Sequence, residues 1–239
     1  MSKNFKLFLG ISYLIILTSF LYLIFLYIDL NRLNEFAYYK EAQASIEKVI
    51  SDNFYLNIIG FFIFSIVWVS LLGFGSPILL ISGIFFGKWI GTILSVASIS
   101  LGALLLYSIF NFFFKEYVKS LLEIRFSKYI NIFKKNEFIY FFAFRLAGGF
   151  GIPFGLQNIL PVIFNINKKN YFFGSLFGFI PIFFIWNTIG SGLNKFIKQS
   201  DEFSLIELIL TKEIFIPVIL FIFLAIVSIF IRKKIFDNE

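Results

Sequence analysis

Two stretches of the chain, GFGSP at Gly73–Pro77 and GFGIP at Gly149–Pro153, share the pattern Gly-Phe-Gly-x-Pro within its most apolar parts. Glycine and proline are the residues least suited to a helix interior. Glycine accepts positive φ and close backbone approach, and proline can open a helix at a position where no N–H is needed. Each pentapeptide therefore predicts the tip of a hairpin between two helices.

Composition places the chain in a membrane. Its 239 residues are 59% hydrophobic with a mean hydropathy of +0.89, whereas soluble domains are about 45–50% apolar. The chain has no Cys and no His, which excludes disulfides, thiolate chemistry, zinc held by Cys or His and an imidazole proton switch. The formal charge of +7 is better explained by basic residues on a cytoplasmic face than by a nucleic-acid partner.

The apolar runs predict four spanning helices, because each is close to the roughly 20 residues that cross a bilayer. They cover residues 7–28, 91–114, 171–193 and 214–231. Residues 7–28 lack the short apolar core and the small-residue cleavage site of a signal peptide. They therefore predict a membrane anchor that is retained.

Two further apolar segments have the wrong length for simple crossings. Two plain crossings over residues 54–114 would leave the basic segment 115–137 outside, against the positive-inside rule. Residues 138–166 are too long for one crossing and too short for two. Both problems disappear if 54–90 and 138–166 are re-entrant hairpins that enter from opposite faces and turn at the pentapeptides. Each tip can then cover the other, as hydrocarbon requires of a broken helix.

The charge distribution agrees with this topology. Segments assigned to the inside hold 13 Lys and Arg, and segments assigned to the outside hold 7, with Arg145 inside the membrane. The asymmetry predicts that both termini and residues 115–137 face the cytoplasm, in a cell (plasma or inner) membrane. Residues 115–137 themselves fit either an interfacial amphipathic helix on an anionic leaflet or a plain linker.

The two hairpin units repeat beyond the pentapeptide. An offset of 76 residues carries Ser98 to Gly174 and Gly102 to Gly178. Small residues four apart let membrane helices approach closely, so these four positions are candidates for helix packing. The alternative is that Gly and Ser are merely common in such helices. Units that start on opposite faces form an inverted repeat, the plan of many transporters.

The predicted fold class is an all-α integral membrane protein with an inverted repeat of two re-entrant helical hairpins. Each hairpin is followed by a spanning helix, and further spanning helices lie at the N- and C-terminal ends. The chain then has an N-terminal anchor with an extracytoplasmic polar segment, a core, and an outer loop with a C-terminal helix and a basic cytoplasmic tail. These parts cover residues 1–53, 54–193 and 194–239.

Arg145 is the candidate centre of function, because it is the only charge well inside an apolar run. Arginine binds phosphate bidentately, and the helix ends at the neighbouring break expose N–H groups that favour anions. With Gln157 and Asn158 on the returning arm, Arg145 predicts a site for a lipid phosphate. The alternative is a structural Arg145 that pairs with backbone carbonyls of the broken helix. The residues expected to shape the two tips are Gly73, Gly75, Pro77, Gly149, Gly151 and Pro153.

Enzyme motifs are missing from the sequence. It contains no HExxH zinc motif, no GxSxG nucleophile elbow and no phosphate-binding P-loop, so we expect neither a catalytic residue nor a metal or cofactor. Within residues 54–136 the acidic residues are Glu116 and Glu123, both at the cytoplasmic end. A carrier driven by protons usually keeps a carboxylate in the membrane, so proton coupling is not expected.

Residues 54–193 resemble the DedA / SNARE-associated Golgi superfamily, in its TVP-type branch, whose shared region is called the VTT domain. The weaker part of the resemblance is a pattern of Pro and small residues at Pro77, Gly83, Phe86 and Gly87. The more specific part is a pattern that begins at the candidate arginine. Its positions are Arg145, Pro153, Phe154, Asn158, Phe172, Gly174, Gly178, Pro181 and Gly190.

The resemblance implies inverted re-entrant hairpins and lipid translocation, as in phospholipid scramblases or polyprenyl-phosphate carriers. The chain departs from the family in two ways. Members often carry an arginine after the first spanning helix of the core, where this chain has Asn111, and the acidic residue of proton-dependent members has no counterpart.

The predicted function is that of a lipid transporter or scramblase that moves a phosphate-bearing lipid, a phospholipid or a polyprenyl phosphate, across the bilayer. Two alternatives stay open, a non-transporting assembly or interaction factor and a small ion channel. The expected partners are membrane lipids, without nucleic acid, and a homo-oligomer is compatible with the sequence.

The topology can be tested with single cysteines, because the chain has none of its own. Cysteines at Lys3, Lys128 and Asn238 should resist an impermeant thiol reagent in intact cells, whereas a cysteine at Glu41 should react. All four should react once the cells are opened. Labelling at Lys128 in intact cells would rule out the predicted topology.

Overall fold

A computed structural model shows a helical chain, with no strand in the part that it describes. It describes residues 35–71 and 74–232, together with single positions before residue 35. The chain divides into two compact units, Met1–Ser45 and Ile46–Glu239. The spanning helix expected at 7–28 lies outside the described ranges, apart from single positions. Within the first unit, Arg32 donates to both carboxylate oxygens of Glu41 at 3.0 and 3.1 Å, which lowers the pKa of that carboxyl.

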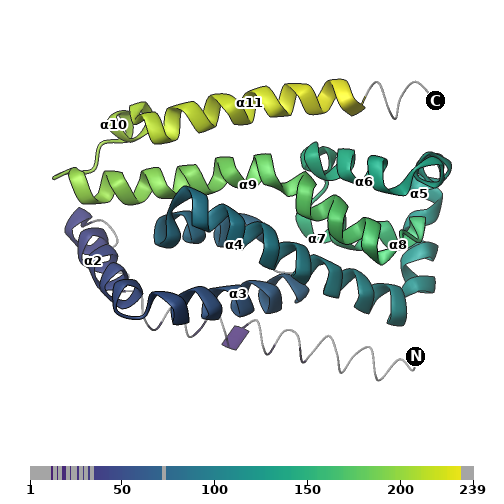
Figure 1. Cartoon of the computed structure of the whole chain (residues 1–239), viewed down its shortest axis with the longest axis horizontal. Helices are drawn as coiled ribbons and strands as arrows, with labels where there is room; N and C mark the ends of the chain where they lie inside the picture. The colour runs from purple at the N-terminus through teal and green to yellow at the C-terminus, as the bar shows by residue number, and fades with distance from the viewer. Residues whose placement is uncertain are drawn as a thin grey trace. The chain divides into compact units, whose positions relative to one another are not determined.

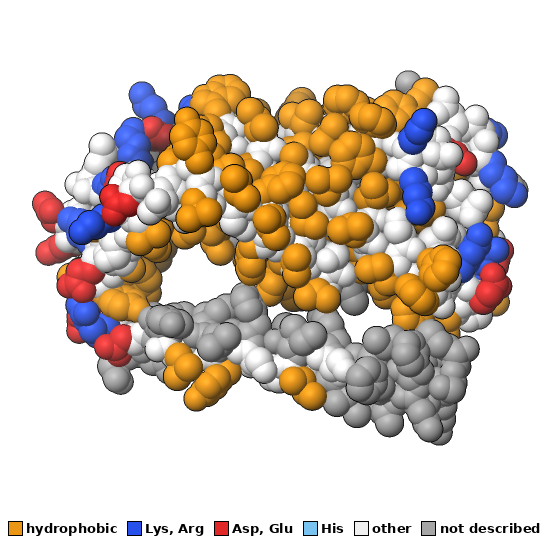
Figure 2. Space-filling model, turned by 60° about the horizontal axis from the view of Figure 1, so that its bottom comes forward, with side chains coloured by type: hydrophobic (Ala, Val, Ile, Leu, Met, Phe, Trp, Pro, Cys, Tyr) orange, Lys and Arg blue, Asp and Glu red, His pale blue; other side chains and the backbone are white. Residues whose placement is uncertain are grey.

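Three described helices are long and apolar enough to cross a membrane, namely α4 (Gly75–Phe113), α9 (Lys168–Gln199) and α11 (Lys212–Arg232). They overlap the spans predicted at 91–114, 171–193 and 214–231. A fourth span results if α2 (Phe36–Asp52) and α3 (Phe54–Ser70), bent by 107°, count as one. Figure 2 shows apolar side chains in a broad band, with charged side chains gathered at both of its ends. The described chain is thus an all-helical protein with apolar helices suited to a membrane.

The long helix α4 consists of two helices that meet at Gly87, whose φ of 72° and ψ of 176° are not helical. The Ser82 hydroxyl donates to the Gly91 carbonyl at 3.0 Å, although nine residues of a straight helix span about 13.5 Å. The chain therefore folds back at Gly87. Residues 75–86 form a returning arm after α3, and residues 88–113 form a separate long helix.

The second hairpin region has the same order of elements. Helix α6 (Glu137–Leu146) leads to the 3-10 turn η2 (Gly148–Gly151), and the chain returns through α7 (Phe154–Ile159) and α8 (Pro161–Phe164). Its returning arm ends at Asn165, which has a φ of 54° and so matches the positive φ at Gly87. The ring of Phe154 lies 3.6 Å from the position that a Cβ on Gly75 would take. The first residues of the two returning arms therefore lie against each other.

One helix contact occurs twice in the fold, at the same offset of 76 residues. A Cβ on Gly102 would lie 2.8 Å from the Ile66 carbonyl oxygen and 2.9 Å from the Val69 Cβ, where α4 crosses α3. The equivalent Gly178 of α9 faces the equivalent residues of α6, since its Cβ would lie 3.1 Å from the Phe142 carbonyl oxygen and 2.5 Å from the Arg145 Cβ. In both places a glycine of a long helix, α4 or α9, lets that helix approach the backbone of the helix it crosses, α3 or α6.

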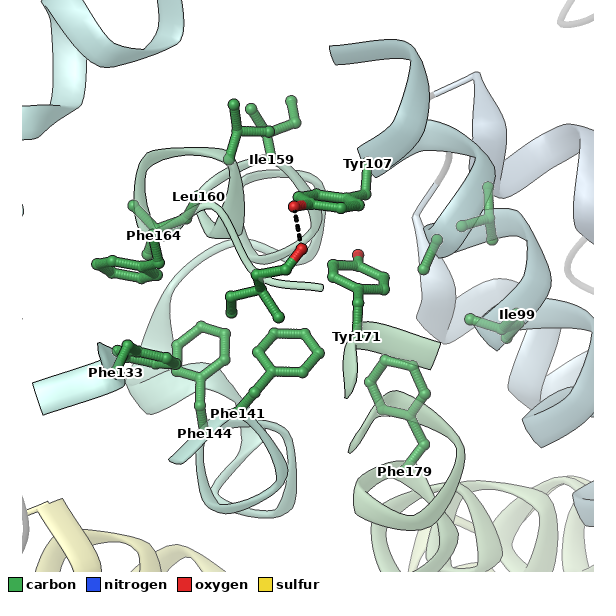
Figure 3. Packing of buried hydrophobic residues seen from close by; sticks show 14 of the residues in the cluster. Ile99, Tyr107, Phe133, Phe141, Phe144, Ile159, Leu160, Phe164, Tyr171 and Phe179 are labelled. Carbon is green, nitrogen blue, oxygen red and sulfur yellow. Dashed lines mark hydrogen bonds between the residues drawn. The ribbon is translucent and has the colours of Figure 1, made fainter. Parts of the chain in front are cut away.

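Aromatic rings form the core around the second hairpin (Figure 3). Tyr107 of α4 stacks on Tyr171 of α9 at 4.5 Å between ring centroids, and Phe141 of α6 stacks on the same tyrosine at 4.8 Å. The buried Tyr107 hydroxyl donates to the Ile166 carbonyl oxygen at 2.5 Å. Stacked pairs of this kind stabilise a structure beyond the area they bury, so the rings hold α4, α6 and α9 together.

Two polar segments are helical. Residues 115–135, for which the sequence leaves both an amphipathic helix and a linker open, form α5 (Lys115–Lys135), which packs on α8 through Phe133 and Phe164 at 4.2 Å. In the segment expected as an outer loop, α9 continues to Gln199 and α10 (Leu205–Leu210) precedes α11 (Figure 1). In the polar end of α9, Lys195 pairs with Glu213, and Lys198 pairs with Glu47.

The tip of the second hairpin depends on glycine. Gly148, Gly149 and Gly151 have φ values of 62°, 69° and 80°, in the left-handed region that other residues rarely adopt. The Gln157 side chain occupies the space above Gly149, and its Nε2 donates to the carbonyls of Gly148 at 3.1 Å and Ile152 at 2.6 Å. Gln157 thus satisfies backbone acceptors that the broken helix leaves without partners.

Replacing tip glycines by alanine should destabilise the protein to different degrees. Gly151→Ala adds only backbone strain, since nothing lies within 4 Å of its Cβ position, and should cost about 1–2 kcal/mol. Gly149→Ala should cost more, because its Cβ would overlap the Gln157 amide. Gly60→Ala, inside α3 with open space around it, is the matched control and should not lower the melting temperature. Equal melting temperatures for the three variants in detergent would contradict this account of the tip.

Candidate functional site

Arg145 lies in the last turn of α6 with its side chain fully buried. Its Nε donates to the Ser175 hydroxyl at 3.2 Å, and its Nη2 donates to the Asn158 Oδ1 at 2.7 Å and the Tyr171 hydroxyl at 2.8 Å. A longer bond of 3.5 Å joins Nη1 to the Gln157 Oε1. A guanidinium has five N–H groups, so these bonds use four of them.

Three aromatic rings surround the guanidinium. Its central carbon lies 4.8 Å from the ring centroid of Phe179, 4.9 Å from that of Phe141 and 5.4 Å from that of Tyr171. An aromatic ring face attracts a cation within about 6 Å, and the attraction is larger where water is excluded. The rings of Phe141 and Phe179 can be followed in the core view (Figure 3).

The charge of Arg145 has no acidic partner within residues 35–71 and 74–232, because no carboxylate there forms an ion pair with it. Its stabilisation comes from neutral oxygens and ring faces. A buried charge without a counter-ion is costly, and an anion that reached it would be bound strongly. An anion is therefore the kind of ligand that the charge of this site would favour.

Two donors at the site lack a protein acceptor among the described residues. The Asn158 Oδ1 accepts from Arg145, but the Nδ2 of the same amide is buried without a partner. The second N–H of the Arg145 Nη1 likewise donates no hydrogen bond to a described residue. An oxygen of a phosphate group can accept both kinds of hydrogen bond.

The structure brings together three of the residues predicted from the sequence, Arg145, Gln157 and Asn158. Gln157 connects the arginine to the tip, since its Oε1 faces Nη1 while its Nε2 binds the carbonyls of Gly148 and Ile152. Pro153 precedes α7, and its carbonyl accepts from the Gln157 N–H at 3.0 Å.

None of the described residues of the first tip forms a hydrogen bond with Arg145. Gly73 is outside the described residues, Gly75 begins α4 against the ring of Phe154, and Pro77 lies in the first turn of α4. Of the packing candidates on α9, Gly174 faces the Phe141 ring, where a Cβ would lie 2.8 Å from Cδ1. Ser98 is buried within α4 and donates to the Ser95 carbonyl at 3.4 Å.

Four residues around Arg145 were not predicted from the sequence. Tyr171, Ser175 and Phe179 are spaced by four along α9, and Phe141 is four residues before Arg145 on α6. Residues four apart share one face of a helix, so a search for side chains on the face of Gly174 and Gly178 would have included the first three. Among the described residues, no group of His, Cys, Asp or Glu could hold a metal ion.

Comparison with known proteins supplies one finding about the family. Neither a curated protein nor a solved structure matches the chain. The model of the VTT domain matches residues 72–192, which is just over half of the chain and includes Arg145, the second tip and most of α9. This match confirms the resemblance noted in the sequence. The chain therefore belongs to the family defined by the VTT domain, the domain of the DedA/SNARE-associated Golgi superfamily.

Proposed function

We propose that this protein lets a phosphate-bearing lipid, a phospholipid or a polyprenyl phosphate, cross the bilayer without covalent chemistry, and that Arg145 binds its phosphate. The observation that carries the proposal is a fully buried arginine without a described acidic partner, beside a helix broken by three left-handed glycines. Membership of the VTT family supports a membrane protein of the DedA type, a family often regarded as transporters.

The bonds of Arg145 differ in how easily a phosphate could replace them. Those to Asn158 and Tyr171 are short, whereas the bond to the Gln157 Oε1 is 3.5 Å long, at the limit of a hydrogen bond. A phosphate oxygen would replace Gln157 on Nη1 and also accept from the Asn158 Nδ2. The same Gln157 side chain donates to the Gly148 and Ile152 carbonyls of the tip. Its displacement by the phosphate would therefore break these two hydrogen bonds.

Entry of the headgroup requires movement, because Arg145 is fully enclosed. The tip of the second hairpin can supply this movement. Glycines accept large changes in φ and ψ, and those at 148, 149 and 151 lie between Arg145 and the returning arm. In this proposal the tip moves away from α9 when phosphate replaces the Gln157 amide, and closes again when the lipid leaves.

The proposal includes an inverted repeat of two re-entrant hairpins. Three features support it: the glycine contact built twice at an offset of 76 residues, the positive φ at the end of each returning arm, and the packing of Phe154 on Gly75. Hydrocarbon tolerates broken helices only where protein covers them, and two hairpins that meet at their tips meet that requirement.

The enclosure of Arg145 also favours a second candidate function, that of an assembly or interaction factor in which the arginine only ties the tip to α9. All four of its described hydrogen bonds go to protein groups, as a purely structural arginine requires. The two functions differ in what removal of the charge does, and substitutions at Arg145 separate them.

We expect Arg145→Lys to fold and to translocate a labelled phospholipid in liposomes about 10- to 100-fold more slowly, because lysine keeps the charge but loses the bidentate fork. Arg145→Leu should abolish translocation while the protein still folds, since the cost of the buried charge disappears with it. Lys88→Leu is the matched control, because it removes an exposed positive charge far in sequence from the tip.

Thermal unfolding of the same variants identifies the structural alternative. If Arg145 only ties the tip, Arg145→Leu should lower the melting temperature strongly, and Arg145→Lys should lower translocation only as far as it lowers folding. A folded Arg145→Leu protein that translocates lipid like the wild type would overturn both roles.

A further inference from the structure

A cavity of about 370 Å³ lies against the tip of the second hairpin, within the range of small-molecule sites. The tip contributes Gly148 and Gly151, α9 contributes Ile182, and α11 contributes one face. On α11 the lining residues Phe221, Leu224, Ala225 and Ser228 follow the spacing of a single helix face. Leu146 also lines the cavity, and the preceding residue in the chain, Arg145, points instead toward Asn158 in the arginine site. The two sites thus share the end of α6.

The lining of the cavity is apolar, apart from Ser228 and the tip backbone. The Ser228 hydroxyl donates to the Ala147 carbonyl oxygen at 2.8 Å, so it caps the end of α6. A polar or charged ligand would lose water there and gain few hydrogen bonds in return. An aliphatic chain would give up no hydrogen bonds by entering.

The tip is filled on one side and open on another. The Gln157 amide fills the space at Gly149, whereas a Cβ on Gly151 would meet nothing within 4 Å. Several lining residues of α11 are exposed, including Phe221 at 40% and Ile229 at 57%. The cavity is therefore open at the surface of two helices that are long and apolar enough to cross a membrane, so in a bilayer it would face lipid hydrocarbon.

We propose that this cavity binds part of one hydrocarbon chain of a membrane lipid. Its volume corresponds to about a dozen groups of the size of a water molecule, which is a segment of a chain and not a whole lipid. The inference rests on the proposed function in assigning that chain to the transported lipid. The phosphate would lie on Arg145, the chain would lie against Ala147–Gly151, and the tip would contact both.

The test uses the full chain in nanodiscs of a phospholipid that carries a photoactivatable diazirine in its acyl chain. Irradiation followed by mass spectrometry should find the label on the tip peptide and on the Ala225–Ser228 face of α11. Ala225→Phe should lower this labelling at least fivefold, because the ring would fill the cavity. Ile222→Phe, on the outward side of the same helix and 54% exposed, is the matched control and should leave it unchanged.

Other outcomes would overturn the proposal. Equal labelling of the tip in the two variants, or labelling confined to outward residues such as Ile222 and Phe223, would show an annular lipid only. A dimer that Ala225→Phe disrupts would show that a second copy of the chain occupies the cavity. If Ala225→Phe does not fold, Ala225→Leu fills part of the space and should lower the labelling in proportion.

The same samples separate this inference from the proposed function. Labelling of the tip without any lipid translocation by the wild type would support binding of a lipid chain in the cavity and overturn lipid transport. Wild-type translocation with no label on the tip would support lipid transport and overturn binding of a lipid chain in the cavity. Loss of both labelling and translocation in folded Ala225→Phe would support the two together.

Discussion

The hydrogen bonds between the elements of the second hairpin centre on one buried guanidinium. Arg145 of α6 binds the Ser175 hydroxyl and the Tyr171 phenol of α9 and the Asn158 amide of α7, so these three helices meet on one side chain. No described carboxylate neutralises it, and aromatic ring faces complete its surroundings. A charge held in this way is stable only while its neutral partners stay in place, which makes their arrangement sensitive to any anion that competes for it.

The second constraint is the one that hydrocarbon sets on the backbone. A helix that breaks in a membrane leaves carbonyls without partners, and here side chains supply them. Gln157 donates to two tip carbonyls and Ser228 donates to a third, while left-handed glycines let the chain turn within four residues. The tip is therefore ordered by two hydrogen-bonding side chains, one of which also contacts Arg145.

Much of this arrangement could be predicted from the sequence. Apolar length predicted the spans at 91–114, 171–193 and 214–231, and the lone charge singled out Arg145. The partners Tyr171 and Ser175 escaped prediction, because a tyrosine and a serine in an apolar helix have many ordinary roles and only tertiary packing selects one. The continuation of α9 to Gln199 also escaped, since the residues that pair with its polar end, Glu47 and Glu213, belong to other segments.

The contact that is built twice has a consequence of its own. Gly102 packs on the Cβ of Val69 as Gly178 packs on the Cβ of Arg145, so the same helix crossing forms on a neutral aliphatic side chain in one half of the molecule. The crossing at Gly102 can therefore be compared with the crossing at Gly178 as one in which valine stands in place of arginine. The comparison shows that this helix crossing forms without a cationic side chain, so the packing of the helices and the charge at the crossing can vary independently. A helix crossing that occurs twice can serve as packing alone in one place while a charged side chain occupies the other.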